Sequence, residues 1–163
     1  MTDVFAVLRL DHQELTRLLR QLHIGPTALT GATSNQLADR ERLAGQLIAA
    51  QSRHEALEAE YFWPAVRGEG AEPARLAAQA AGQEQEAIMA LARLAGLDAR
   101  AAEFEPLLTE VISSGLEHIE FEELQVWPVL RQVFSAARAS ELGAEVALAL
   151  AAASDYARTP SEG

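Results

Sequence analysis

One short segment occurs twice in the chain, and each copy carries a histidine, a glutamate and a Trp-Pro pair at the same spacing. The two copies contain His54, Glu58 and Trp63-Pro64, and His118, Glu122 and Trp127-Pro128. The whole sequence has only two tryptophans and four histidines, so this match is hard to obtain by chance. Residues four apart on a helix lie on one face, about one turn from each other. The repeat therefore predicts two related helices, each offering an imidazole and a carboxylate on the same face.

Length and composition indicate one all-α domain. A chain of 163 residues is long enough to bury a real core and short enough to form a single domain. Alanine and leucine are abundant, and strand-like runs of β-branched and aromatic residues are missing. No apolar stretch approaches the roughly 18 residues of a membrane span. We predict one helical bundle over residues 1–157, with its core at 2–134, and a flexible tail at 158–163.

The spacing of apolar residues predicts four long helices joined by short connections. They span 4–22, 36–67, about 73–95 and a fourth segment that begins between Asp98 and Pro106. Trp127-Pro128 is expected to kink or close the fourth helix, because a proline inside a helix loses one hydrogen bond and crowds the preceding turn. This pattern favours an up-down-up-down four-helix bundle. An additional C-terminal helix at 138–157 would pack outside the bundle or cap one end.

A fainter repeat adds a third candidate histidine. His12 lies four residues after Leu8 and three before Leu15, on the apolar stripe of the first helix, and so faces the interior. The segment around His12 aligns with the segment around Gln85 in the third helix. The chain thus resolves into two helical hairpins. They offer His12, His54 and Glu58 from the first hairpin, and Gln85, His118 and Glu122 from the second. An approximate two-fold axis between the hairpins would bring these side chains together at mid-bundle.

Such a convergence predicts a centre for two metal ions. Imidazole and carboxylate ligands without sulfur suit iron, manganese or zinc. Carboxylates turned into a bundle core need a partner, because burying an unpaired charge is costly. The chain has no lysine to neutralise Glu58 and Glu122. Arginine is the competing partner, but Arg17 and Arg53 fall off the buried stripes and are expected to face solvent. Two cations would balance the glutamates, which could bridge them.

Cysteine content and charge exclude other classes of protein. There is no cysteine, which removes disulfide frameworks, thiolate zinc sites and iron–sulfur clusters together. The formal charge of −11 repels phosphate backbones, so we expect no nucleic-acid partner. Residues 1–9 lack a basic start followed by an apolar stretch. We therefore expect no secretory signal, no membrane association and a cytoplasmic location.

On these residues the chain resembles a hemerythrin-like protein of the HHE cation-binding group. The resemblance covers about residues 2–134 and is carried by His12, by His54 and Glu58 with Tyr61-Phe62-Trp63-Pro64, and by His118 and Glu122 with Trp127-Pro128. It implies a four-helix bundle with a non-haem di-iron centre, bridged by the two glutamates and completed by histidines. It also implies a small diatomic or peroxide ligand, because the family's activities include oxygen carriage, oxygen or iron sensing, and handling of peroxide or nitric oxide. A ferritin-like centre would need Glu-x-x-His pairs, which the sequence lacks.

The third helix departs from the family pattern. Gln85 stands where the family has a histidine, and an amide oxygen is a weaker iron ligand than imidazole. We therefore expect two irons, of which the second is weakly held or leaves a position open to water or oxidant. Glu55 is a further candidate ligand, because some relatives use a carboxylate at the matching position. Glu84 and Glu86 are less favoured substitutes.

Three functions compete at this point. The first is a di-iron protein that binds or reduces a small oxidant. The second is a sensor or regulatory module that responds to oxygen or iron, and the third is a metal-depleted helical scaffold, which Gln85 makes conceivable. Taken alone, each His-Glu pair would be better explained as a helix-surface pair, which contributes little to stability. Its duplication together with Trp-Pro favours metal binding. The sequence sets neither catalytic turnover nor the oligomeric state.

Overall fold

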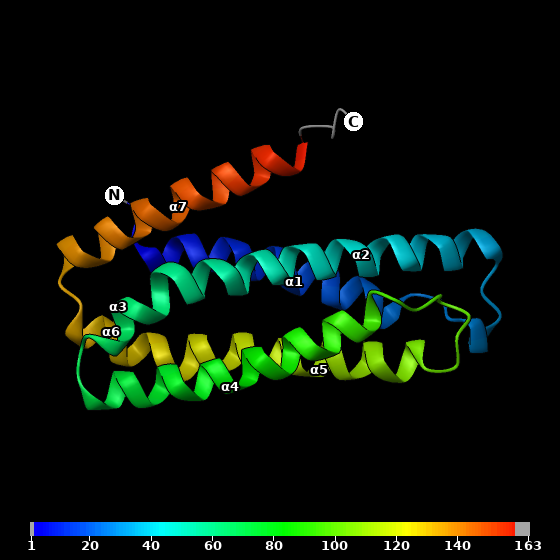
Figure 1. Cartoon of the computed structure of the whole chain (residues 1–163), viewed down its shortest axis with the longest axis horizontal. Coiled ribbons are helices and arrows are strands. Elements are labelled where there is room, and N and C mark those ends of the chain that lie inside the picture. The colour runs from blue at the N-terminus through cyan, green and yellow to red at the C-terminus, as the bar shows by residue number, and fades with distance from the viewer. Residues whose placement is uncertain (1, 159–163) are drawn as a thin grey trace.

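Four long helices lie side by side along the molecule and alternate in direction (Figure 1). The computed structural model describes residues 2–158, and within them it contains helices, turns and bends but no strand. The long helices are α1 (Val4–Ile24), α2 (Ser34–Leu57), α4 (Ala71–Leu94) and α5 (Phe104–Phe121). The predicted all-α, up-down-up-down bundle is confirmed.

Two of these helices continue through a widened turn. The π-helical turns η2 (Glu58–Phe62) and η3 (Glu122–Val126) follow α2 and α5, and lead into α3 (Trp63–Arg67) and α6 (Trp127–Val133). In both turns the backbone N–H of the tryptophan donates a hydrogen bond to the backbone carbonyl of the glutamate five residues earlier. The following proline has no N–H and would crowd the carbonyl four residues back, and a wider turn relieves that crowding. Of the two expectations for Trp127-Pro128, closure of the helix is wrong, since helix continues to Val133, and the departure from regular α-helix takes the form of the π-helical turn before the proline.

Side-chain caps fix where α1 and α2 begin. The Asp3 carboxylate accepts a hydrogen bond from the N–H of Ala6 at 2.8 Å. Thr33 and Gln36 form a reciprocal capping box at the start of α2. The loop between the two helices contains the short 3₁₀ helix η1 (Ala28–Thr30), which has its own cap at Thr27. These caps define the ends of the two helices that carry His12 and His54.

The additional C-terminal helix, α7 (Ala136–Arg158), packs outside the four-helix bundle against the N-terminal part of α1 (Figure 1). A Cβ at Gly143 would lie 2.7 Å from backbone atoms of Asp3 and Val4, so this close approach requires glycine. The predicted helix at 138–157 is present in the outside position. Of the predicted tail, 158–163, Arg158 ends α7 and the other residues lie outside the described part of the chain.

The hydrophobic core consists of two clusters. One contains both tryptophans and lies where α1 meets α3, α6 and α7. The other is rich in leucine and fills the opposite half of the bundle. Buried polar side chains from residues 11–12, 54–58, 84 and 118–122 lie between these clusters. We call this region the polar layer. Its histidines and carboxylates have lost water, so they require compensating partners.

One buried ion pair lies away from the polar layer. Arg40 donates to both carboxylate oxygens of Glu105 at 2.6 Å and to the carbonyl of Leu22 at 2.8 Å. These bonds tie α2 to α5 and to the end of α1. The bidentate geometry satisfies both charges locally, so this pair is part of the scaffold.

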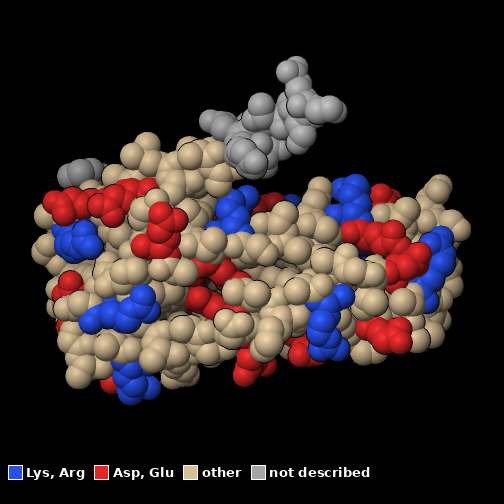
Figure 2. Space-filling model, in the orientation of Figure 1, with Lys and Arg blue, Asp and Glu red and all other residues tan. Residues whose placement is uncertain are grey.

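No helix in the described part of the chain is long and apolar enough to cross a membrane. On the face shown in Figure 2, arginines and acidic side chains are interspersed, and the arginines form no continuous patch.

Candidate metal centre

All five side chains that the repeat marked as metal ligands lie in the polar layer. They are His12 of α1, His54 of α2, Glu58 of η2, His118 of α5 and Glu122 of η3. Every one is buried, and Glu58 and Glu122 are both 0% exposed. Each glutamate opens its π-helical turn one helical turn after its histidine. The duplicated segment thus delivers a histidine and a carboxylate from each of two helices.

The donor atoms form two overlapping groups. Within each group, one ligand atom per residue lies within 4.8 Å of all the others. The first position comprises His12, His54, Glu58 and Glu122, and the second comprises Glu58, Glu84, His118 and Glu122. The two glutamates from the repeat belong to both positions. Carboxylates that bridge two cations need this shared placement.

The third long helix contributes Glu84 and not Gln85. The Gln85 side chain is exposed, whereas Glu84 is buried at 7% exposure. Residue 85 points about 100° around the helix from residue 84 and so away from the centre. The prediction that Gln85 helps to hold the second ion is therefore wrong. The spacing within α4 carries the correct signal, since its buried residues recur every three or four positions, as in Leu76, Ala80, Glu84, Ala87 and Leu91.

Glu55 lies beside the centre and belongs to neither group of donor atoms. Its side chain is buried, and its Oε1 accepts a hydrogen bond from Nε2 of Gln51 at 3.0 Å. Burial raises the pKa of Glu55 to about 7. Its second oxygen, Oε2, has no hydrogen-bond partner. Glu55 is thus a neighbour of the donor atoms rather than one of them.

Each of the three histidines is oriented by an oxygen atom at Nδ1. The contacts join His12 to Glu123 at 3.0 Å, His54 to Asp11 at 3.0 Å and His118 to Gln83 at 2.8 Å. An oxygen partner holds the proton on Nδ1 and leaves the lone pair of Nε2 free for a metal. These three partners are not among the residues predicted from the sequence. A signal was present, because each one directly adjoins a donor residue of another helix in the sequence.

The inward-facing atoms lack hydrogen-bond partners. Nε2 of His12 and of His118 lie 3.1 and 3.0 Å from oxygens of Glu122, and Nε2 of His54 lies 3.3 Å from an oxygen of Glu58. None of these nitrogens, and none of the four oxygens of the two glutamates, makes a hydrogen bond. When the histidines carry a proton on Nδ1 alone and the glutamates are deprotonated, both members of each close pair are acceptors and repel one another.

A metal ion resolves this conflict between acceptors. Bonds of about 2.0–2.2 Å to nitrogen and oxygen place neighbouring ligand atoms about 3 Å apart when they meet near a right angle. That spacing matches the distances between the histidine nitrogens and glutamate oxygens. The residues present therefore fit metal ions at both positions.

The pKa values of the two shared glutamates are shifted in opposite directions. Burial, and then the negative charge of Glu122, raise the pKa of Glu58 well above its ordinary value. Burial also disfavours the charge on Glu122, but His118 and His12 outweigh it and hold the pKa of Glu122 below its usual range. Burial raises the pKa of Glu84 to about 7. Because carboxylates bind metal in the deprotonated form, a cation must displace protons here.

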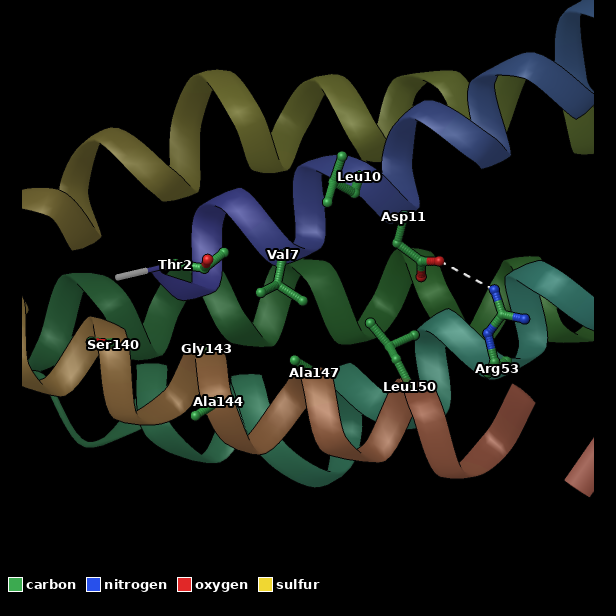
Figure 3. A pocket seen from close by; sticks show the side chains of 10 residues that line it. All are labelled: Thr2, Val7, Leu10, Asp11, Arg53, Ser140, Gly143, Ala144, Ala147 and Leu150. Carbon is green, nitrogen blue, oxygen red and sulfur yellow. Dashed lines mark hydrogen bonds and ion pairs between the residues drawn. The ribbon is translucent and has the colours of Figure 1, made fainter. Parts of the chain in front are cut away.

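Arginine does not neutralise the shared glutamates. Arg53 is half-buried instead of facing solvent as expected, and its Nη2 lies 3.2 Å from Oδ1 of Asp11, the carboxylate that orients His54. Figure 3 shows this ion pair at one end of a groove that α1 and α7 line. Arg17 is exposed, as expected. Within the described residues, no arginine pairs with Glu58 or Glu122, so the competing explanation of an arginine partner is not supported.

A small cavity adjoins the centre between His54 and His118. Its volume is about 10 Å³, close to the space of roughly 10–15 Å³ that one water molecule requires. The other lining side chains are apolar except for two, and comprise Leu15, Leu19, Gln51, Glu55, Gly115 and Ile119. Only a very small ligand fits this space beside the histidines.

Comparisons with known proteins agree with the fold and the kind of site. The family model of the hemerythrin HHE cation-binding domain matches residues 3–130, which is most of the chain. A crystal structure of a hemerythrin HHE cation-binding domain-containing protein from Mycobacterium kansasii has a TM-score of 0.78 and 20% sequence identity, and the match covers 100% of this chain and 95% of that one. At this identity the likeness shows the fold alone. A comparison with curated proteins gave no match. The match to the family model shows that the chain belongs to the hemerythrin HHE cation-binding domain family.

Proposed function

We propose that this protein is a di-iron protein that binds or reduces a small oxidant, namely dioxygen, peroxide or nitric oxide. His12, His54, Glu58 and Glu122 would hold one ion, and Glu58, Glu84, His118 and Glu122 the other. Bound iron would supply electrons and open coordination positions for such an oxidant. Zinc has no redox chemistry, and manganese fits the same ligand types.

The observation that carries this proposal is the set of inward-facing atoms without partners. In a metal-depleted scaffold, only added protons on the histidines and on Glu58 could pair these buried Nε2 atoms with the carboxylate oxygens, which make no hydrogen bond in the structure. Each such group costs about 1–3 kcal/mol in a folded protein. Metal ions satisfy all of them at once and neutralise the carboxylates. Protons satisfy fewer of these atoms than metal ions do, because each proton joins only one donor to one acceptor.

The adjoining cavity, which has room for about one water molecule, limits an oxidant to very few atoms. Leu15, Leu19 and Ile119 form the apolar part of its wall, beside His54 and His118. Two oxygen atoms in this cavity's lining, Oε1 of Gln51 and Oε2 of Glu55, are buried without partners. They can accept hydrogen bonds from a protonated ligand such as peroxide or water. The chain thus provides a small space with two acceptors next to the metal ligands.

Substitution of Gly115 tests the role of this cavity. A Cβ at Gly115 would lie 3.2 and 3.4 Å from the two terminal carbons of Leu19, so Gly115→Ala fills the space. The variant should retain its iron. It should bind azide, a small anionic probe, about tenfold more weakly, because crowding of this size costs about 1–3 kcal/mol. Azide binding is followed by visible absorption of the iron-loaded protein.

Gly82→Ala is the matched control, since Gly82 also lies in a helix and an added Cβ there meets nothing within 4 Å. It should leave both iron content and azide affinity unchanged. Unaltered azide affinity in Gly115→Ala would show that the oxidant does not use this cavity. Iron-loaded protein whose visible spectrum responds to neither azide, peroxide, nitric oxide nor dioxygen would overturn the proposed function.

A further inference from the structure

We propose that the two metal positions differ in selectivity: the first strongly favours iron, whereas the second exchanges its ion more readily and accepts an oxygen-preferring ion such as manganese(II) in competition with iron. This inference rests on the proposed two-iron centre: both positions hold iron when iron alone is supplied, and manganese(II) competes mainly for the second. The internal repeat suggests two equal positions, but their ligand sets differ.

The ligand atoms differ in kind. The first position has two imidazole nitrogens, from His12 and His54, besides the two shared glutamates. The second position has a single imidazole, His118, and takes the carboxylate of Glu84 in place of the other nitrogen. Imidazole suits iron and zinc, whereas carboxylate suits manganese and magnesium. Iron is therefore favoured over manganese more strongly at the first position.

The groups that orient the histidines differ as well. His12 and His54 face the carboxylates of Glu123 and Asp11 through Nδ1, whereas His118 faces the neutral amide of Gln83. A carboxylate at Nδ1 raises the basicity of the ligand nitrogen more than an amide does, and loss of such partners typically costs 10–100-fold in metal affinity. The single nitrogen of the second position is thus also the weaker donor.

Arginines hold the two carboxylates that serve the first position. Arg53 lies 3.2 Å from Asp11 (Figure 3), and Arg9 lies 3.4 Å from Glu123. Each histidine of this position therefore ends a chain that runs from arginine through carboxylate to imidazole. Gln83 has no such anchor. It lines a surface pocket with Glu117 and Glu120, whereas His12 of the first position lines a surface pocket with Arg9, Arg17 and Arg20. The surface beside the second position is thus the more acidic one.

Metal-resolved diffraction tests the assignment directly. The full-length metal-free protein is loaded without oxygen in a mixture of manganese(II) in excess over iron(II). Anomalous scattering on both sides of the iron and manganese absorption edges then gives the share of each metal at each position. We expect the ratio of iron to manganese at the first position to exceed that at the second by about tenfold or more, the lower end of the partner effect alone.

Two substitutions separate the causes. Glu84→His adds a nitrogen to the second position and should raise its iron share toward that of the first. Gln83→Glu gives His118 a carboxylate partner and should strengthen metal binding at the second position about tenfold. The matched control is Gln85→His, because Gln85 neighbours Glu84 but is exposed. It should change neither position.

The outcomes distinguish this inference from the function on which it rests. Equal iron shares at both positions of the wild-type protein would overturn the division of metals and leave the di-metal centre standing. A response to Gln85→His instead of Glu84→His would overturn it too, because the ligand set would then be different. Absence of metal from both positions would overturn the proposed function together with the inference.

Discussion

Glu58 illustrates how a single residue can be tuned for a cation. It is fully buried, neither of its oxygens has a hydrogen-bond partner, and it belongs to both groups of donor atoms. Burial and the neighbouring Glu122 raise its pKa well above the ordinary value. In the metal-free protein, burial therefore favours the protonated form of Glu58, and a metal ion that binds Glu58 as an anion must replace that proton.

Glu58→Gln should separate metal binding from folding. Glutamine has the shape of the protonated acid, so we expect the free energy of unfolding of the metal-free variant to change by less than about 1 kcal/mol. Iron content should fall below one ion per chain, because both positions lose a shared ligand. Elemental analysis and thermal unfolding of the metal-free protein measure the two effects.

Glu60→Gln provides the control, since Glu60 lies in the same π-helical turn but is exposed. It should behave like the wild type in both measurements. A Glu58→Gln protein that still binds two irons would remove Glu58 from the centre.

At the scale of the helix, the π-helical turns decide which way the glutamates face. Glu122 begins η3, and the N–H of Trp127 bonds to its carbonyl five residues back. The extra residue in this turn changes the rotational phase between the residues before and after it by about 100°. The histidine before the turn and the tryptophan after it can therefore both face the interior.

Pro128→Ala should weaken metal binding without unfolding the bundle. Alanine restores a backbone N–H and removes the ring that crowds the preceding turn, so an ordinary α-helical turn becomes accessible. We expect iron affinity to fall about tenfold or more, the range seen when groups that orient ligands are lost. Titration with iron(II) measures the affinity, and far-ultraviolet circular dichroism checks that helix content is retained. Unchanged affinity would mean that the proline does not hold Glu122 in place.

The spacing of side chains along each helix decides how much of the centre can be predicted from the sequence. The two strong repeats gave His54, Glu58, His118 and Glu122, because a four-residue spacing on a helix is a local property. The prediction for the third long helix was wrong, because aligning the two hairpins assumes that matching helices are rotated equally about their own axes. The structure breaks that equality, with His12 inward on α1 and Glu84, not Gln85, inward on α4.

Other features of the centre depend on tertiary packing. The contact between Nδ1 of His54 and Asp11 joins residues of different helices, so neither sequence neighbourhood contains it. Apolar periodicity likewise does not predict the π-helical turns, although each Trp-Pro pair indicates where one occurs. Helix number and direction were predictable because long apolar stripes and short connections leave few arrangements.

At the scale of the whole molecule, the polar layer couples proton binding to folding. In the metal-free protein the raised pKa values are those of Glu55 and Glu84, both to about 7, and of Glu58, His12 and His118. His54, Asp11 and Glu122 work in the opposite direction: burial lowers the pKa of His54, and, against the effect of burial, neighbouring histidines lower the pKa values of Asp11 and Glu122. Between the ordinary carboxylate pKa of 4.5 and about 7, the folded chain thus holds more protons than the unfolded chain.

Stability should therefore depend on pH with opposite signs in the two states. For the metal-free protein, the free energy of unfolding falls as pH rises through this window, since the folded state binds more protons. For the iron-loaded protein, metal competes with those protons, and stabilisation by metal grows as pH rises. We expect the gap between the two melting temperatures to widen from about pH 5 to pH 8. Differential scanning calorimetry at constant ionic strength measures it, and a gap independent of pH would contradict the proton count.

The central claim is that buried histidines and glutamates at mid-bundle hold two metal ions. Elemental analysis tests it most directly, on metal-free protein loaded with iron(II) without oxygen and then passed through gel filtration. We predict two irons per chain in the wild type and a large loss when both His54 and His118 are replaced by alanine. A folded wild-type protein that retains no iron, or a double variant that retains as much as the wild type, would contradict it.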